Sequence, residues 1–304
     1  MHAGFTETGA LPSDTEDVIN MTLAIAGVEA AVVERLIDAA CRLDYPVSAL
    51  EILVLDDSTD KTALLAQNKV DQCARQGVPI RRIQRADRAG YKAGNLVHGI
   101  QHSQGEFFAI FDADFLPPAD FLQKTIPPFK DAKLGFLQTG IGYENRDHSF
   151  LTRFQAMEMG HQQYVTVGLS EDGDMASLSG SSCVWRRACV EALGGWNAST
   201  ITEDVDLGYR AQFGDWKYAY LRDVVSMSTL PENTNDPSGS STTGSSSTSY
   251  SSRISPTISS STSSMVTMPA VPPNSSITIA MCVCSRCISR SSCSTGLESG
   301  TNSG

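Results

Sequence analysis

The chain has 304 residues, of which 41% are hydrophobic, and a formal net charge of −11. This length and apolar content allow one large domain or two small ones. The acidic balance argues against a nucleic-acid-binding protein, which usually carries a basic face, and against a polybasic membrane-surface module. No run of about 18 apolar residues occurs, so we expect no bilayer-spanning helix, and the acidic N-terminus does not resemble a secretory signal.

The composition divides the chain into three parts. Residues 1–17 are polar and predicted to be disordered, residues 18–231 predict one folded domain, and residues 232–304 form a Ser/Thr-rich tail. The tail has too little apolar surface to order itself, so we expect a disordered extension or a flexible linker to a partner. Its cysteines follow the spacing C-x-C-x2-C-x5-C, which matches neither a usual zinc site nor a known disulfide framework. They receive no role.

Predicted strands and helices alternate through the folded part. In chain order we expect strand 21–26, helix 32–43, strand 51–57, helix 61–76, strand 79–86, helix 90–103, strand 106–114, helix 117–126, strand 134–143, helix 150–167, a helix starting near residue 202, and strand 214–223. Continuous apolar strands alternating with helices are typical of an α/β fold with a mostly parallel central sheet covered on both faces. Ligands of such sheets bind at the carboxyl ends of the strands.

Two aspartates, Asp112 and Asp114, end the most apolar stretch of the chain, FFAIFDADFL. In an extended chain their side chains point to the same side, with Cα atoms about 7 Å apart. Carboxylates that close repel each other, and a hard divalent cation such as Mg²⁺ would remove that cost while it binds substrate phosphates. The alternative is an acidic loop at a strand end that holds no metal.

A second predicted strand ends in VLDDSTD, with Asp56 and Asp57 at its carboxyl end. One of these carboxylates could accept hydrogen bonds from a ligand base or ribose. The same letters also make a good turn and helix cap, because Asp, Ser and Thr satisfy free backbone N–H groups. We therefore expect Thr59 or Asp60 to cap the helix that starts at Lys61.

The stretch RADRAGYKAGNL places Gly90, Lys92, Gly94 and Asn95 where a loop enters a helix. Glycines allow the backbone to approach a polyanion, and Lys92 adds a point charge at a helix N-terminus. The letters do not form the G-x-x-x-x-G-K-[ST] loop, which excludes a P-loop NTPase. An ordinary turn is the alternative.

In TITEDVDLGYR, Thr200 and Glu203 have the spacing of a capping box at a helix start. Acidic residues are common in the first helical turn because of the helix dipole, which explains Glu203, Asp204 and Asp206 without a catalytic role. The functional interpretation makes one of them a general base that takes a proton from an acceptor hydroxyl.

Taken in order, these four motifs resemble the cellulose-synthase-like branch of the family 2 inverting glycosyltransferases, most closely its glucan and mannan synthases. They are VLDDSTD (54–60), GYKAGNL (90–96), AIFDADFLP (109–117) and TEDVDLGYR (202–210), and residues 184–197 and 214–223 also resemble the family. The resemblance covers roughly residues 32–231. It implies a GT-A fold.

The resemblance also implies a substrate and a metal. The donor would be a nucleotide sugar, UDP-glucose or GDP-mannose in type, with its nucleobase held by Asp56 or Asp57. Lys92 would contact the nucleotide. Asp112, itself also a donor contact, and Asp114 would bind Mg²⁺ or Mn²⁺ on the diphosphate.

For the acceptor side, the resemblance implies that Asp204, beside Glu203, is the base that activates a hydroxyl of a polysaccharide or glycolipid. The product would be a β-linkage formed with inversion. The family works on the cytosolic side of a membrane, whereas this chain taken alone would be soluble and cytoplasmic.

The sequence departs from the family pattern at both ends. AIAGVEAAV replaces the usual Pro-x-Tyr-Asn-Glu-like turn, and only Glu29 could match it; no Gln-x-x-Arg-Trp motif occurs, nor do the family's membrane helices. A truncated or frame-altered gene product would give this pattern. The alternatives are therefore a nucleotide-sugar-binding remnant without turnover and, from a different class, a D-x-D phosphatase of the haloacid dehalogenase type with Asp112 as nucleophile.

Overall fold

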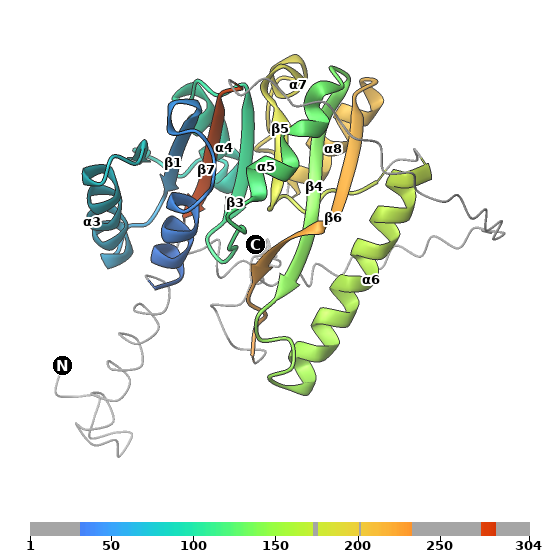
Figure 1. The fold of residues 1–304 in the computed structure, drawn as a ribbon, viewed down its shortest axis with the longest axis horizontal. Helices are drawn as coiled ribbons and strands as arrows, with labels where there is room; N and C mark the ends of the chain where they lie inside the picture. Colours follow the sequence, from blue (N-terminus) through green and yellow to red (C-terminus); the bar gives the residue numbers. More distant parts are fainter. Residues whose placement is uncertain (1–30, 173–175, 201, 233–274, 284–304) are drawn as a thin grey trace, which may run out of the picture.

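The computed structural model describes residues 31–172, 176–200, 202–232 and 275–283, which form one seven-stranded sheet with helices on both faces (Figure 1). The strands are β1 (Leu50–Asp56), β2 (Ile80–Ile83), β3 (Phe107–Asp112), β4 (Leu134–Tyr143), β5 (Cys183–Arg186), β6 (Lys217–Ser228) and β7 (Ile277–Val283). The helices are α3 (Lys61–Arg75), α4 (Tyr91–Gln101), α5 (Phe121–Thr125), α6 (Phe150–Asp172), α7 (Arg187–Ala192) and α8 (Glu203–Phe213), with 3₁₀ turns at Val47–Ala49 and Pro127–Lys130. A further helix covers residues 31–41.

The strand order across the sheet is β2-β1-β7-β3-β5-β4-β6. Of the strands that the structure describes, β5 alone runs antiparallel to its neighbours, β3 and β4, and the other neighbouring strands are parallel. The prediction of a mostly parallel sheet covered by helices is therefore confirmed. Because β1, β7 and β3 run in the same direction, their carboxyl ends lie at one edge of the sheet.

The core lies in two layers, one on each face of the sheet. In β1, Ile52 and Val54 pack in the cluster that includes the helix at residues 31–41 and α3, whereas Leu53 and Leu55 pack in the cluster that includes α4. All four side chains are fully buried. Successive strand residues point to opposite faces, so a strand buried on both sides needs an unbroken apolar run, as the sequence predicted.

The central strand β7 comes from the predicted tail, which corrects the expectation that residues 232–304 are disordered throughout. Residues Ile277–Val283 lie between β1 and β3 and pair in parallel with both. Ile277, Ile279 and Met281 are fully buried. The segment ITIAMCV alone is β-branched and apolar, and the surrounding Ser/Thr-rich composition hid it. The predicted strand at residues 21–26 and Cys284, Cys287 and Cys293 lie outside the described residues.

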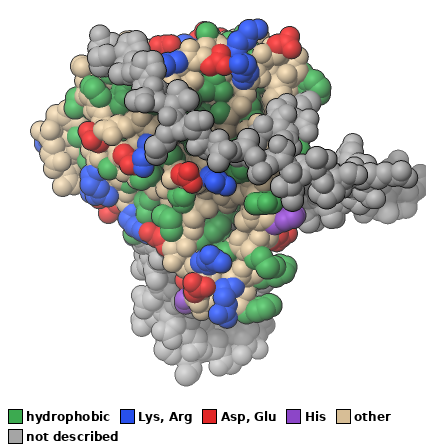
Figure 2. Space-filling view, turned by 45° about the vertical axis from the view of Figure 1, so that its right-hand side comes forward, with side chains coloured by type: hydrophobic (Ala, Val, Ile, Leu, Met, Phe, Trp, Pro, Cys, Tyr) green, Lys and Arg blue, Asp and Glu red, His purple; other side chains and the backbone are tan. Residues whose placement is uncertain are grey.

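Helix α6 lies along the outer edge of the sheet, and it extends past the predicted end at residue 167 to Asp172. Gln163 fixes it there, since its side chain bonds both backbone groups of Ile141 in β4 and accepts from the Tyr220 hydroxyl of β6. Several of its large apolar side chains are exposed, among them Phe150 and Tyr164 at 78% and 79%, beside polar ones such as Arg153 and His161. In Figure 2, hydrophobic side chains follow one another down the lower right of the view, where α6 comes forward.

The helix predicted to start at the proline pair 117–118 starts later. Its first residue is Phe121, after a turn in which the Phe121 N–H donates to the Pro118 carbonyl at 3.0 Å. The prolines therefore shape the turn before α5, and the helix itself is a single short turn.

Candidate functional site

The aspartates of two predicted motifs lie at the same edge of the sheet. Asp56 ends β1 and Asp112 ends β3, with β7 between them. Two strand spacings separate their backbones by about 9–10 Å. Both motifs thus stand where an open α/β sheet binds ligands.

Asp56 and Asp57 are held by arginines from β2 and from the segment that follows it. The Asp56 carboxylate accepts from Arg82 Nε at 2.6 Å and from the Ser58 N–H at 2.7 Å, and it is fully buried. Asp57 accepts two bonds from the guanidinium of Arg85, the one from Nε measuring 3.0 Å, and its carbonyl accepts from Arg88. Ligand binding at the Asp56 carboxylate would therefore have to displace these partners.

Sequence reasoning missed these arginines. Arg82, Arg85 and Arg88 recur every third residue in RIQRADR, which begins at Arg82 in β2 and continues past the end of that strand. Buried carboxylates need a charged partner. The regular spacing of these arginines, next to a strand whose neighbour ends in two aspartates, was therefore a signal that could have predicted the pairing.

Lys92, in the first turn of α4, joins the second motif to the third and the fourth. Its Nζ lies 2.7 and 2.9 Å from the two oxygens of Asp112, 3.2 Å from the Gly180 carbonyl and 4.0 Å from Glu203 Oε1. Burial acts to lower the pKa of Lys92, but the charges of Asp112 and Glu203 outweigh it and raise the pKa well above its ordinary value. The amine is therefore a fixed cation inside a ring of acids.

Glu203 and Asp204 start α8 and face the same ring. Burial raises the pKa of both carboxyls, and the charge of Lys92 opposes the rise in each. Asp204 Oδ1 accepts from the Val205 N–H at 2.8 Å. A carboxylate with a raised pKa is a stronger base, which is the property that proton abstraction from a hydroxyl requires.

The predicted capping box is wrong. The N-cap of α8 is Thr202, which makes no side-chain cap bond, and the Thr200 hydroxyl donates instead to the Asn197 carbonyl at 2.9 Å. Asp206 forms an ion pair with Arg210 one turn later, at 2.7 Å. By contrast Asp60 does cap α3, accepting from the Thr62 N–H at 2.9 Å, as the sequence predicted.

The loop before β5 also borders the site, and sequence reasoning missed this loop too. Ser181 Oγ accepts from the Asp112 N–H at 2.9 Å. Gly180 has φ +72°, and a Cβ there would lie 2.1 Å from Asp204 Oδ2. The letters S-G-S-S between a helix and a strand were the available signal, because a glycine there permits both a left-handed backbone and a close approach.

Asp114 connects the site to the other half of the sheet. Its Oδ2 accepts from the hydroxyl of Ser228, the last residue of β6, at 2.7 Å. Burial raises the pKa of Tyr143 at the end of β4, and the Asp114 charge adds to this. Asp114 therefore faces the ends of β4 and β6.

Asp112 and Asp114 are carboxylates of the kind that a hard divalent cation takes as ligands. Within the described ranges, no three His, Cys, Asp or Glu side chains lie close enough together to hold a metal ion. A Mg²⁺-type ion does not need three, because it usually takes one or two carboxylates together with substrate phosphates and water. Asp112 and Asp114 supply two such carboxylates at the edge where Lys92 would meet an anion.

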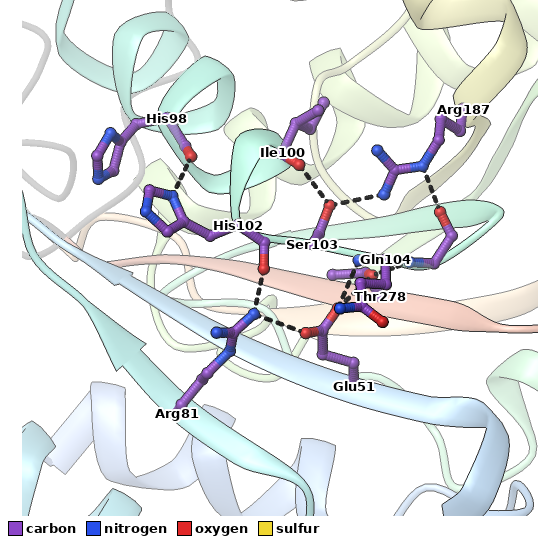
Figure 3. Close-up of polar contacts among 10 residues, drawn as sticks. Glu51, Arg81, His98, Ile100, His102, Ser103, Gln104, Arg187 and Thr278 are labelled. Carbon is purple, nitrogen blue, oxygen red and sulfur yellow. Dashed lines mark hydrogen bonds and ion pairs between the residues drawn. The ribbon is translucent and has the colours of Figure 1, made fainter.

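A cavity of about 450 Å³ opens at the opposite edge, where β1 and β7 begin. Its charged groups satisfy one another: Arg81 lies 2.7 Å from Glu51, which also accepts from the Gln104 N–H and the Thr278 hydroxyl (Figure 3). Because no charge in this network lacks a partner, we assign it a structural role.

Comparison with known proteins decides the family. The family described as "Glycosyltransferase like family 2" matches residues 20–246, three quarters of the chain. The chain belongs to glycosyltransferase family 2. This confirms the resemblance seen in the motifs and argues against the D-x-D phosphatase alternative.

Several plant proteins that are similar to this chain carry the name of a mannosyltransferase. "Probable glucomannan 4-beta-mannosyltransferase 11" of Oryza sativa subsp. japonica is 38% identical over 201 residues, covering 64% of this chain and 35% of that protein. "Probable glucomannan 4-beta-mannosyltransferase 3" of Arabidopsis thaliana is 38% identical over 212 residues, covering 67% and 38%. The chain thus spans little more than a third of the length of these relatives.

Solved structures support the GT-A fold. The mannosyltransferase PcManGT from Pyrobaculum calidifontis, determined in complex with GDP-Man and Mn²⁺, aligns with a TM-score of 0.55 at 22% identity over 68% of this chain and 55% of that one. None of the described helices combines the length and hydropathy needed to cross a bilayer.

Proposed function

We propose that this chain binds a nucleoside-diphosphate hexose and transfers the hexosyl group to a hydroxyl of a glycan, with inversion at the anomeric carbon. The observation that carries the proposal is the convergence of Lys92, Asp112, Glu203 and Asp204, from three separate segments, at the carboxyl edge of the sheet. Neither a cap nor a turn explains a lysine buried among acids from β3 and α8.

The donor that we favour is GDP-mannose rather than UDP-glucose. The plant relatives are named mannosyltransferases, and the mannosyltransferase of similar fold was solved with GDP-Man and Mn²⁺. The name of the plant relatives also points to a polysaccharide acceptor of the glucomannan type rather than a glycolipid. All of these are properties of the relatives, and we extend them to this chain as a proposal.

On the donor side, Lys92 would bind the diphosphate, and Asp112 and Asp114 would hold Mg²⁺ or Mn²⁺. When bound, the ion would supply positive charge for the leaving diphosphate. Lys92 already neutralises Asp112. A bound diphosphate would therefore also contact the Lys92 amine, and the Asp112 carboxylate would then be able to bind the metal. Asp57, which Arg85 holds, lies directly after β1 at the edge where the donor would bind. We propose that this segment contacts the nucleobase.

On the acceptor side, Asp204 would take the hydroxyl proton. The acceptor oxygen then forms the new bond to the anomeric carbon, the bond from that carbon to the diphosphate oxygen breaks, and its electron pair leaves on the diphosphate. A single displacement of this kind turns an α-linked donor into a β-linked product. Glu203, 4.0 Å from Lys92, would keep the amine and the base in place.

The test measures binding and transfer separately in the full chain. Donor binding is followed by calorimetry with GDP-mannose and UDP-glucose, with and without Mn²⁺, and transfer with labelled donor and mannan oligosaccharides. We expect Asp204→Asn to bind donor normally and to lose about 10²–10⁴-fold in transfer rate. We expect Asp112→Asn to lose the metal-dependent part of binding.

Asp206→Asn is the matched control, because Asp206 lies in the same helical turn but pairs with Arg210. It should transfer at the wild-type rate. Transfer unaffected by Asp204→Asn would refute the assignment of the base. Metal-dependent donor binding without transfer or hydrolysis in the wild-type chain would instead favour the non-catalytic remnant.

A further inference from the structure

Two histidines lie together at the end of α4 that is remote from the acidic ring. His98 is in the last turn of α4, and His102 is its C-cap residue. Residues four apart on a helix share one face, and here the ring centroids are 4.5 Å apart. Figure 3 shows the two rings side by side.

A backbone bond fixes which nitrogen of His102 is available. Its Nδ1 lies 2.9 Å from the His98 carbonyl oxygen. A carbonyl can only accept, so Nδ1 carries the hydrogen and Nε2 of the neutral ring keeps its lone pair. A bond from one ring nitrogen to a backbone carbonyl is the arrangement that orients histidines as metal ligands.

The backbone of His102 is also fixed in place. Its carbonyl accepts from Arg81, which pairs with Glu51 at 2.7 Å (Figure 3). The end of α4 is therefore anchored to β1 and β2, while the His102 side chain is exposed. A ligand at the ring would meet a rigid residue and lose little conformational freedom on binding.

The surroundings of His98 favour its neutral, ligating form. Burial lowers the pKa of His98, the neighbouring His102 and Arg85 lower it further, and Asp57 opposes them. Arg85 is itself bonded to the Asp57 carboxylate, which offsets its charge near the pair. A cation that approaches His98 thus meets a ring whose lowered pKa favours the neutral form.

We propose that His98 and His102 form a two-histidine site for a borderline divalent transition metal such as Zn²⁺, Ni²⁺ or Cu²⁺. Imidazole suits these ions, and two histidines four residues apart on one helical face are the pairing found in helical zinc sites. In the described part of the chain no third ligating side chain joins them, so water would complete the coordination.

This site is distinct from the proposed donor-side metal. Lys92 lies six residues from His98 and ten from His102, which is about 9 and 15 Å along the helix axis. The two sites also differ in chemistry, since carboxylates and phosphates select Mg²⁺ or Mn²⁺ and imidazoles select Ni²⁺, Cu²⁺ and Zn²⁺. Metal at the histidines would fasten the last turn of the helix that carries Lys92.

The experiment titrates the full chain with NiCl₂ by calorimetry at pH 7.5 and records Cu²⁺ electron paramagnetic resonance spectra at one equivalent. The variants are His98→Gln and His102→Gln, with His161→Gln as the control, because His161 is an isolated exposed histidine on α6. Other histidines and cysteines of the chain add background, so the difference between variants is the readout. Thermal melts without metal check that each variant is folded.

We expect either pair variant to weaken Ni²⁺ binding at least about tenfold and to remove one nitrogen from the Cu²⁺ spectrum, while His161→Gln changes neither. Mg²⁺ should give no heat at this pair. Equal Ni²⁺ affinity in all four proteins, or an equal loss in His161→Gln, would overturn the proposal. Neither result would touch the proposed transferase activity, which is tested with GDP-mannose and Mn²⁺.

Discussion

At the scale of single residues, the site depends on how closely Gly180 approaches Asp204. The glycine has φ +72°, and its missing Cβ would fall on Asp204 Oδ2. A backbone carbonyl from the same residue contacts Lys92 at 3.2 Å. One glycine therefore positions both the proposed base and the cation beside it.

Gly180→Ala should move Asp204 and abolish most activity. The left-handed backbone alone should cost about 1–2 kcal/mol in the free energy of unfolding, and a misplaced base should cost about 100-fold in transfer rate. Gly194→Ala is the matched control, because Gly194 has φ +78° but nothing within 4 Å of its Cβ position. It should lose similar stability in urea titrations and keep its rate. Equal rate losses in both variants would mean that strain, and not the Asp204 contact, is responsible.

At the scale of elements, the two helices that follow the acidic motifs begin differently. Asp60 caps α3 through a bond to the Thr62 N–H at 2.9 Å, whereas Thr202 at the start of α8 makes no side-chain cap bond. The first turn of α8 instead uses its own acidic side chain, since Asp204 Oδ1 accepts from the Val205 N–H at 2.8 Å, and a helix N-terminus favours this negative charge.

Alanine substitutions at these two N-cap residues should change the free energy of unfolding by different amounts. Asp60→Ala should lower the free energy of unfolding by about 1 kcal/mol because it removes a cap bond. Thr202→Ala should change it by less than about 0.5 kcal/mol. Urea denaturation followed by circular dichroism measures both, and a larger loss in Thr202→Ala would show that its hydroxyl does cap α8 in solution.

The elements also show what the sequence could predict and why the rest failed. β4 was predicted with its observed bounds, because LGFLQTGIGY is bounded by turn residues and charges on both sides. The start of α5 was misplaced, because the prolines at 117–118 act in the preceding turn, which local propensity cannot show. The Thr200–Glu203 capping box failed for a similar reason: Thr200 finds its partner in the turn at Asn197. Local sequence patterns predicted the type of each element, whereas tertiary contacts determine where the elements begin and end.

At the scale of the whole molecule, the largest departure from expectation is the origin of the central strand. Ile277–Val283 lie more than forty residues beyond the last preceding described strand, β6, in a tail whose composition predicted disorder. Non-local pairing of this kind has no local sequence signal. The candidate site was more predictable, because Lys92, Asp112 and Asp204 lie in motifs tied to strand ends and helix starts. The arginines that hold Asp56 and Asp57, and Gly180 beside Asp204, required the fold.

The strand β7 should be essential for folding, because without it β1 and β3 would expose two unpaired, apolar edges. Ile279→Ala should lower the free energy of unfolding by about 2–5 kcal/mol, the usual cost of truncating a fully buried side chain. A chain ending at residue 232 should aggregate or lose the cooperative melt. Val225→Ala, in β6 at 39% exposure, is the control and should cost far less. If the shortened chain melts cooperatively and still binds GDP-mannose with Mn²⁺, β7 is dispensable, and the carboxyl edge that holds Asp56 and Asp112 forms without it.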